Sequence, residues 1–150
     1  MRIAVSSDSL DGVAGALADA LRDRGHVVAA THGALDPRER DDWAWASAAA
    51  ARDVVAGRAD QAVVACWTGT GASIAANKLP GIRAALCGDA ATAAGARRWN
   101  DANVLALSLR TVSAPLLDEI LDAWFATAAS DEPDDRANVA HLDALPEETE

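Results

Sequence analysis

The sequence is poor in cysteine, aromatic residues other than tryptophan, and long apolar runs. Its 150 residues include two cysteines, one phenylalanine, one methionine and no tyrosine. No run approaches the roughly twenty apolar residues of a membrane-spanning helix, which argues against a membrane protein. The N-terminus, Met-Arg-Ile-Ala-Val-Ser, has no secretory pattern, so we expect a cytoplasmic protein in which Cys66 and Cys87 are free thiols.

Basic residues are also scarce, since 13 Lys and Arg stand against 23 Asp and Glu and give a net charge of −10. A nucleic-acid partner requires a concentrated basic patch, and none is visible, so we expect no nucleic-acid binding. Much of the acidic excess lies in residues 131–150. This composition predicts a solvated, partly disordered tail after a domain of residues 1–130, with a possible short helix from Asp134 to Leu145 that could pack on a neighbouring subunit.

Short runs of Val, Ile and Leu alternate with longer alanine-rich segments along the chain. This rhythm is typical of β-α units around a parallel sheet, and the length favours one domain. The sequence therefore predicts an α/β fold with a five-stranded parallel sheet. The expected strands are Arg2–Ser6, His26–Thr31, Gln61–Cys66, Ile82–Cys87 and Asn103–Ser108, and the expected helices are Val13–Arg24, Trp43–Ala56, Gly71–Asn77, Ala90–Trp99 and Ala114–Ala126.

The segment from Cys66 to Gly71 places a thiol and a glycine turn where the third strand gives way to a helix. Parallel sheets bind ligands at the carboxyl ends of their strands. The helix N-terminus favours a thiolate that could act as a base, and the backbone N–H groups of residues 69–73 could point at an oxyanion. Spacing alone fits a buried structural cysteine equally well. The glycine turn by itself is weak evidence, since such turns recur in many nucleotide and phosphate sites.

Two charged residues follow other strands. Asp8 could hold a substrate hydroxyl or cap the next helix, and Arg110 could clamp a phosphate or carboxylate or form a surface ion pair. Most of the five tryptophans are expected in the core or an interface, but Trp67 and Trp99 flank candidate site positions. The three histidines show no metal-ligand spacing, so the sequence predicts neither a metal site nor a cofactor.

Five longer motifs extend this pattern. They are Ser7-Asp8, Cys66-x-Thr-Gly-x-Gly-x-Ser-Ile-Ala-Ala-Asn-Lys78, Pro80-Gly-Ile-Arg-Ala-Ala-Leu-Cys87, Asn100-Asp-Ala-Asn-Val-Leu-Ala-Leu107 with Arg110, and Asp122-Ala-Trp124. Together they resemble the ribose-5-phosphate isomerase B and galactose-6-phosphate isomerase family. The resemblance implies a Rossmann-like three-layer sandwich, a homodimer or a tetramer with shared active sites, and aldose–ketose isomerisation of a sugar phosphate through an enediolate.

The resemblance also implies a role for each matching residue. The proton-transfer residues are Cys66, the base between C1 and C2, and Thr68, which assists at the oxygens; the binding residues are Gly69, Gly71 and Ser73 for the enediolate, Asp8 for sugar hydroxyls, and Asn100, which reaches in from the partner subunit. A poised base beside oxyanion donors is what proton abstraction next to a carbonyl requires.

Three positions depart from the family pattern. Ser9 replaces a histidine that binds phosphate or hydroxyl, Trp99 replaces the histidine that opens the furanose ring, and of two phosphate-binding arginines only Arg136 can remain. Ribose 5-phosphate is therefore disfavoured. A four-carbon sugar 4-phosphate cannot close a furanose ring, so we expect a short or open-chain sugar, its phosphate held mainly by Arg110. The weakened phosphate site also permits an unphosphorylated sugar.

Two other functions were weighed against an isomerase. A non-catalytic sugar-binding subunit that pairs with an active homologue is compatible with the replaced residues. A dinucleotide-dependent enzyme is disfavoured, because the glycine turn follows the third strand rather than the first.

Overall fold

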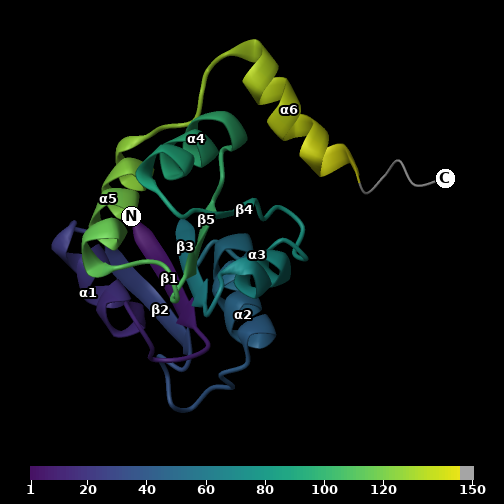
Figure 1. Cartoon of the computed structure of the whole chain (residues 1–150). Coiled ribbons are helices and arrows are strands. Elements are labelled where there is room, and N and C mark those ends of the chain that lie inside the picture. The colour runs from purple at the N-terminus through teal and green to yellow at the C-terminus, as the bar shows by residue number, and fades with distance from the viewer. Residues whose placement is uncertain (146–150) are drawn as a thin grey trace.

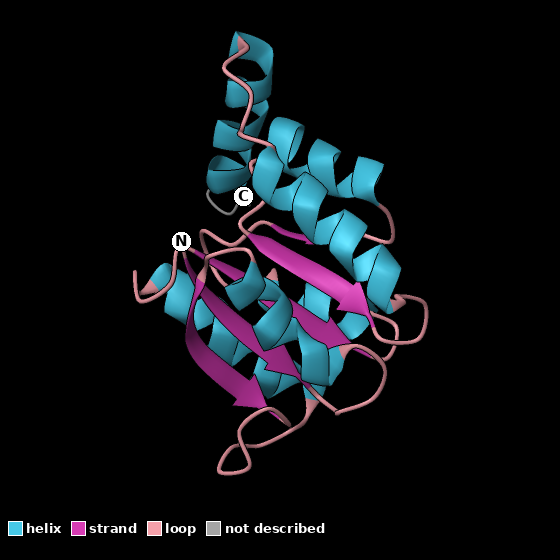
Figure 2. Cartoon of the chain, turned by 90° about the vertical axis from the view of Figure 1, so that its left-hand side faces the viewer, coloured by secondary structure: helices cyan, strands magenta, loops and turns pink. Residues whose placement is uncertain are grey.

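A single parallel sheet organises the computed structural model, which describes residues 1–145. Its strand order is β2-β1-β3-β5-β4 (Figures 1 and 2). The strands are β1 (Arg2–Ser7), β2 (Val27–Gly33), β3 (Gln61–Cys66), β4 (Ala84–Leu86) and β5 (Val104–Ser108). All four pairings are parallel, which confirms the predicted α/β fold.

Helices cover both faces of the sheet (Figure 2) and make the predicted three-layer sandwich. The helices are α1 (Leu17–Asp23), α2 (Trp43–Val55), α3 (Thr70–Ala76), α4 (Ala90–Asn100), α5 (Ala114–Ala126) and α6 (Pro133–Ala144). Alternate strand residues face opposite layers. Leu105 and Leu107 pack with α1, α4 and α5, whereas Val104 and Ala106 pack with α2 and α3.

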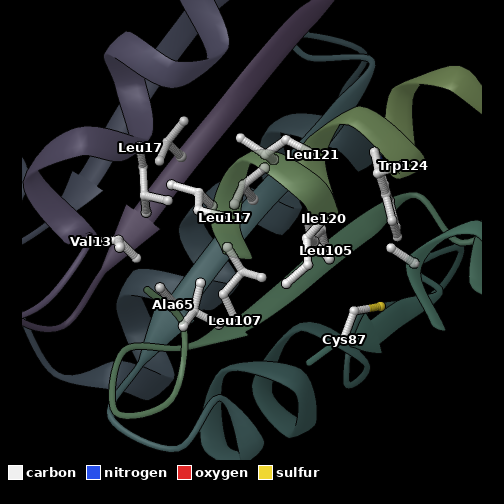
Figure 3. Packing of buried hydrophobic residues seen from close by; sticks show 14 of the residues in the cluster. Val13, Leu17, Ala65, Cys87, Leu105, Leu107, Leu117, Ile120, Leu121 and Trp124 are labelled. Carbon is white, nitrogen blue, oxygen red and sulfur yellow. The ribbon is translucent and has the colours of Figure 1, made fainter. Parts of the chain in front are cut away.

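The core on the α1, α4 and α5 side is built from large side chains (Figure 3), including Leu117, Leu121 and the buried Trp124. The indole N–H of Trp124 donates to Oε1 of Gln61 at 2.7 Å, which satisfies its polar group inside the core. Cys87 lies in the same cluster, and burial raises the pKa of its thiol to about 12. Both cysteines are free, as predicted.

Most predicted elements end one or two residues from the observed bounds, and the differences at the fourth strand and the first helix have identifiable causes. The fourth strand is shorter than Ile82–Cys87, because the N–H of Arg83 donates to the side chain of Asn103 at 2.8 Å rather than to a neighbouring strand. The first helix was predicted from Val13, but residues 14–16 form a 3₁₀ turn and α1 begins at Leu17. Gly15 stands in that turn and disfavours the α-helix there.

The helix α6 stands apart from the sandwich and lies beside α4 (Figure 1). It confirms the helix predicted from Asp134 to Leu145, and none of its residues is buried. The last part of the predicted acidic tail, residues 146–150, lies outside the described residues. Of the helices in residues 1–145, none combines the length and apolar character needed to cross a bilayer.

Candidate active site

The strand order reverses between β1 and β3, and the carboxyl ends of these two strands meet at that point. Ser7 of β1 pairs with Ala65 of β3, so the next residues, Asp8 and Cys66, emerge side by side. Such a switch point is where open α/β sheets form their ligand crevices. The fold therefore brings together a carboxylate and a thiol that are 58 positions apart in the sequence.

Cys66 ends β3 beneath the first turn of α3. Its Sγ accepts a hydrogen bond from the N–H of Ala72 at 3.4 Å, and the residue is 4% exposed. A backbone N–H donor on sulfur and the positive end of a helix both stabilise negative charge there. The thiol is thus held beside the backbone N–H groups at the start of α3.

Fewer backbone N–H groups are available to an oxyanion than the sequence predicts for residues 69–73, the segment called the oxyanion loop below. The N–H of Gly69 donates to the carbonyl of Cys66 at 3.3 Å, and that of Ser73 donates to the carbonyl of Gly69 at 3.0 Å, so both are already engaged. Within residues 1–145, the N–H groups of Thr70 and Gly71 have no acceptor, as expected at a helix N-terminus. These two donors can bind an oxyanion.

Gly69 makes the turn possible because it adopts a left-handed conformation with φ of 74°. A Cβ there would lie 2.4 Å from Cδ1 of Leu86 and 2.9 Å from the backbone carbonyl carbon of Leu107. Both the backbone angle and the lack of space require glycine. The loop is therefore fixed by the packing of its backbone against β4 and β5.

Trp43 is a site residue that the sequence did not reveal. A Cβ on Gly71 would be 2.8 Å from Cε3 of Trp43, so the indole lies directly against the oxyanion loop. Trp43 is 46% exposed, so part of its indole surface beside Gly71 faces solvent. The only sequence signal is its place as the first residue of a helix capped by Asp42, at the carboxyl edge of the sheet.

Asp8 has a partly unsatisfied carboxylate at the carboxyl edge of the sheet. Its Oδ1 is buried without a hydrogen-bond partner, and burial raises its pKa, with the charges of Asp11 and Asp41 adding to the effect. It does not cap the following helix, whose first turn has no side-chain cap, so that alternative is wrong. Ser9, next to it, is occupied locally: its hydroxyl donates to Oδ2 of Asp11 at 3.1 Å.

Thr68 and Arg110 lie at the same edge and are exposed. The Oγ1 atoms of Thr68 and Thr70 are 2.7 Å apart, which makes a short hydroxyl pair beside the oxyanion loop. The backbone N–H of Arg110 donates to the carbonyl of Trp67 at 2.9 Å and fixes the residue at the end of β5. Among residues 1–145, its guanidinium forms no ion pair, so the surface ion pair that the sequence also allowed is not found there.

Three predicted site residues lie at the opposite edge of the sheet. Trp99 and Asn100 end α4, just before β5 begins at Val104, whereas the far end of β5 pairs with Cys66. Four strand residues separate the two edges by roughly 13 Å. Arg136, on α6, lines a groove of about 560 Å³ together with Trp99. One chain therefore holds two groups that do not meet.

We name these groups by their edges. The carboxyl-edge group comprises Asp8, Ser9, Cys66, Thr68, Gly69, Gly71, Ser73 and Arg110, and the amino-edge group comprises Trp99, Asn100 and Arg136. Of the five tryptophans expected in the core or an interface, only Trp124 is buried in the core of this chain. The other four are about half exposed, and two of them, Trp43 and Trp99, mark the two edges.

Comparison with known proteins places the chain in a family. A family model described as ribose/galactose isomerase matches residues 3–142. Ribose-5-phosphate isomerase B of Escherichia coli is 43% identical over 86 residues, which cover 57% of this chain and 58% of that protein, so the match spans little more than half of its length.

Two further comparisons cover more of the chain. D-erythrulose-4-phosphate isomerase of Pectobacterium atrosepticum is 36% identical over 129 residues, which cover 83% of this chain and 82% of that protein. The structure of Clostridium thermocellum ribose-5-phosphate isomerase B superposes with a TM-score of 0.85 at 34% identity, covering 98% of both chains. The chain belongs to the ribose/galactose isomerase family.

Proposed function

We propose that this chain is a cytoplasmic aldose–ketose isomerase of a sugar phosphate, in which Cys66 carries a proton between C1 and C2 of the substrate. The observation that carries the proposal is the position of its Sγ, which is held by the N–H of Ala72 beside the free N–H groups of Thr70 and Gly71. This arrangement supplies a base and two oxyanion donors within one turn of α3. Two free cysteines fit a reducing compartment.

The reaction follows from these groups. The thiolate of Cys66 removes the proton from C2 of an open-chain aldose, and the electron pair moves to the carbonyl oxygen on C1 to give an enediolate. The N–H groups of Thr70 and Gly71 stabilise the oxyanion. The hydroxyl of Thr68 moves a proton between O2 and O1, and the Cys66 thiol then returns its proton to C1, which leaves the ketose.

Asp8 and Arg110 bind the remainder of the substrate. The unpartnered Oδ1 of Asp8 can accept a hydrogen bond from a sugar hydroxyl, which would satisfy that buried oxygen. The exposed guanidinium of Arg110 can bind the phosphate at the outer end of the crevice. Gly69 and Gly71 allow the backbone to approach the enediolate closely.

We propose a short or open-chain sugar phosphate as the substrate, with a tetrose 4-phosphate as the best case. The indole of Trp99 cannot act as an acid or base toward a ring oxygen in the way an imidazole would, whereas an open-chain substrate needs no ring opening. The similarity to a D-erythrulose-4-phosphate isomerase over 82% of that protein supports this choice.

The same proposal includes a homodimer. The amino-edge group lies across the sheet from Cys66, and a second copy of the chain would bring its Asn100, Trp99 and Arg136 to the carboxyl edge. The projecting helix α6, which buries none of its own residues, would then pack on the second subunit beyond the domain of residues 1–130. Both active sites of such a dimer would be shared.

The experiment is a panel of tetrose, pentose and hexose phosphates and the free sugars, assayed for aldose–ketose conversion. We expect turnover of a tetrose 4-phosphate and a loss of about 10²–10⁴-fold in Cys66→Ala. Cys87→Ala is the matched control, because it removes a thiol that lies in the core, away from the crevice, and should retain activity. Absence of turnover across the panel, or an active Cys66→Ala, would overturn the proposal.

A second candidate is a non-catalytic subunit that pairs with an active homologue. Trp99 in place of a ring-opening group favours it, since the amino-edge group then offers a partner only packing and the amide of Asn100. A homodimer that converts a sugar phosphate without any other chain would exclude this candidate.

A further inference from the structure

Asp101 has an unusual backbone conformation directly after Trp99 and Asn100. It is the only residue other than glycine with a positive φ in residues 1–145, with φ of 42° and ψ of 44°. Its N–H and that of Ala102 both donate to the carbonyl of Ala96, the pattern of a helix C-terminus that glycine usually occupies. A side chain at this position strains the backbone, so an aspartate here calls for another reason.

Two arginines from different elements hold the Asp101 carboxylate. Nη2 of Arg83, which precedes β4, lies 3.1 Å from Oδ2, and Nη1 of Arg97, on α4, lies 3.0 Å from Oδ1. Arg83 Nε also donates to the Asp101 carbonyl at 2.8 Å, and Arg97 donates to the carbonyl of Ala102. Both arginine side chains are largely buried, at 19% and 12% exposed.

These contacts fix the direction in which α4 ends. Arg83 links the turn to the segment before β4, which is itself tied to Asn103 by the N–H of Arg83 at 2.8 Å. Arg97 links the same carboxylate back to the last turn of α4. Trp99 and Asn100, which lie in that turn, remain exposed, and the Trp99 indole lies against Gly95 one turn earlier in the same helix.

We propose that Asp101 is a positioning residue, whose two-arginine clamp holds Trp99 and Asn100 in the orientation that they need in the active site of a second copy. The inference rests on the proposed function, because it requires shared sites. It assigns a role to a group that touches no substrate and acts through the side chain of Asn100. The clamp explains why aspartate rather than glycine occupies the strained turn.

The test uses full-length chains with two different tags, so that mixed dimers can be purified. Asp101→Ala and Asp101→Gly both remove the carboxylate, and the glycine variant also relieves the backbone strain. We expect each homodimer to lose about 10²-fold in kcat, while its circular dichroism spectrum stays the same as that of the folded parent. Asp60→Ala is the matched control: Asp60 also pairs with an arginine, Arg2, at 2.7 Å and has similar exposure, but it lies far from α4 in the chain and should retain kcat.

Mixed dimers separate positioning from folding. A dimer of an Asp101→Gly chain and a Cys66→Ala chain contains one site in which both Cys66 and the clamped Asn100 are intact. We expect it to regain about half of the parent activity, as should the dimer of Asn100→Ala with Cys66→Ala. A merely destabilised Asp101 chain would not rescue its partner.

The other possible results of these experiments each contradict a different claim: the positioning role of Asp101, the shared site or the proposed function. If Asp101→Gly is as active as the parent, or if its mixed dimer stays inactive while the Asn100→Ala mixed dimer recovers, the positioning role of Asp101 is wrong. If neither mixed dimer recovers although the Asn100→Ala homodimer is impaired, the shared site is wrong. If the parent converts no sugar phosphate or Cys66→Ala is fully active, the proposed function itself fails, and the inference fails with it.

Discussion

The carboxyl edge and the amino edge of this molecule are built in different ways. The carboxyl edge is formed mainly by backbone groups. Gly69 turns the chain, the N–H of Ala72 donates to the Cys66 sulfur, and the N–H groups of Thr70 and Gly71 have no acceptor within residues 1–145. At the amino edge, the candidate groups are side chains, and the turn that follows them is held by the Asp101 pairs with Arg83 and Arg97. A backbone-built edge tolerates few substitutions, whereas a side-chain edge can be altered one residue at a time.

The largest effect should follow a change of the backbone-built edge. Gly69→Ala places a methyl group 2.9 Å from the Leu107 carbonyl carbon in a left-handed conformation. We expect a loss of about 1–3 kcal/mol in the free energy of unfolding and about 10²-fold in kcat. Chemical denaturation and initial rates measure both.

Gly81→Ala isolates the backbone angle in that experiment. Gly81 has φ of 79°, close to that of Gly69, but its Cβ would meet nothing within 4 Å. It should lose stability without losing kcat. Equal losses of kcat in the two variants would contradict a special role for the Gly69 turn.

Trp43, at the same edge, should limit the size of the sugar phosphate that the site accepts. Trp43→Ala removes the indole that lies against Gly71, and we expect the ratio of kcat/KM for pentose over tetrose phosphates to rise about tenfold. Trp45→Ala is the control, because Trp45 is equally exposed but contacts Arg40 and Arg52 instead. An unchanged ratio of kcat/KM in Trp43→Ala would contradict a contact between the indole and the substrate.

The side-chain edge should accept substitution with little cost in stability. Trp99 is 55% exposed, and in Trp99→His we expect the free energy of unfolding to change by no more than about 0.5 kcal/mol. Activity toward ribose 5-phosphate should increase relative to a tetrose phosphate, because an imidazole can exchange protons with a ring oxygen. A large loss of stability would show that the two edges do not differ as described.

The smallest effect concerns pH and the segment that leads to Trp43. His32 lies 2.7 Å from Asp53 on α2 and 2.9 Å from Glu39 in the segment between β2 and α2. Burial disfavours protonation of His32, but hydrogen bonds to the two carboxylates outweigh it and raise its pKa above the ordinary 6.5. Its contribution to stability is therefore complete below pH 6.5 and is lost as the pH rises through the raised pKa.

We expect His32→Gln to lose about 1 kcal/mol or less relative to the parent at about pH 6, and less at about pH 9. Urea denaturation at the two pH values measures the difference. His26→Gln is the control, since burial and the nearby N-terminus and Arg24 lower the pKa of His26. A difference that grows toward high pH would reverse the sign and contradict the role of His32.

The carboxyl edge could be predicted from the sequence because its chemistry is local. A thiol, two glycines and the start of a helix lie within six residues, so they can be recognised without knowledge of the fold. The alternation of short apolar runs with alanine-rich segments was enough to predict the five strands. Trp43 was missed because its contact with Gly71 depends on how α2 packs beside α3. Asp101 was missed because its conformation depends on Arg83, which is distant in sequence and has no local signature.

The alanine-rich layer between the sheet and the helices α2 and α3 has a mechanical consequence. Ala4, Ala62 and Ala106 of the sheet share a buried cluster with Ala50 and Ala72, so small side chains make much of the contact between the sheet and these helices. One added methylene in this layer would displace the start of α2 and change the gap between Trp43 and Gly71 without touching either residue. Substitutions in this buried layer should therefore change the distance between Trp43 and Gly71 while leaving every polar group of the site in place.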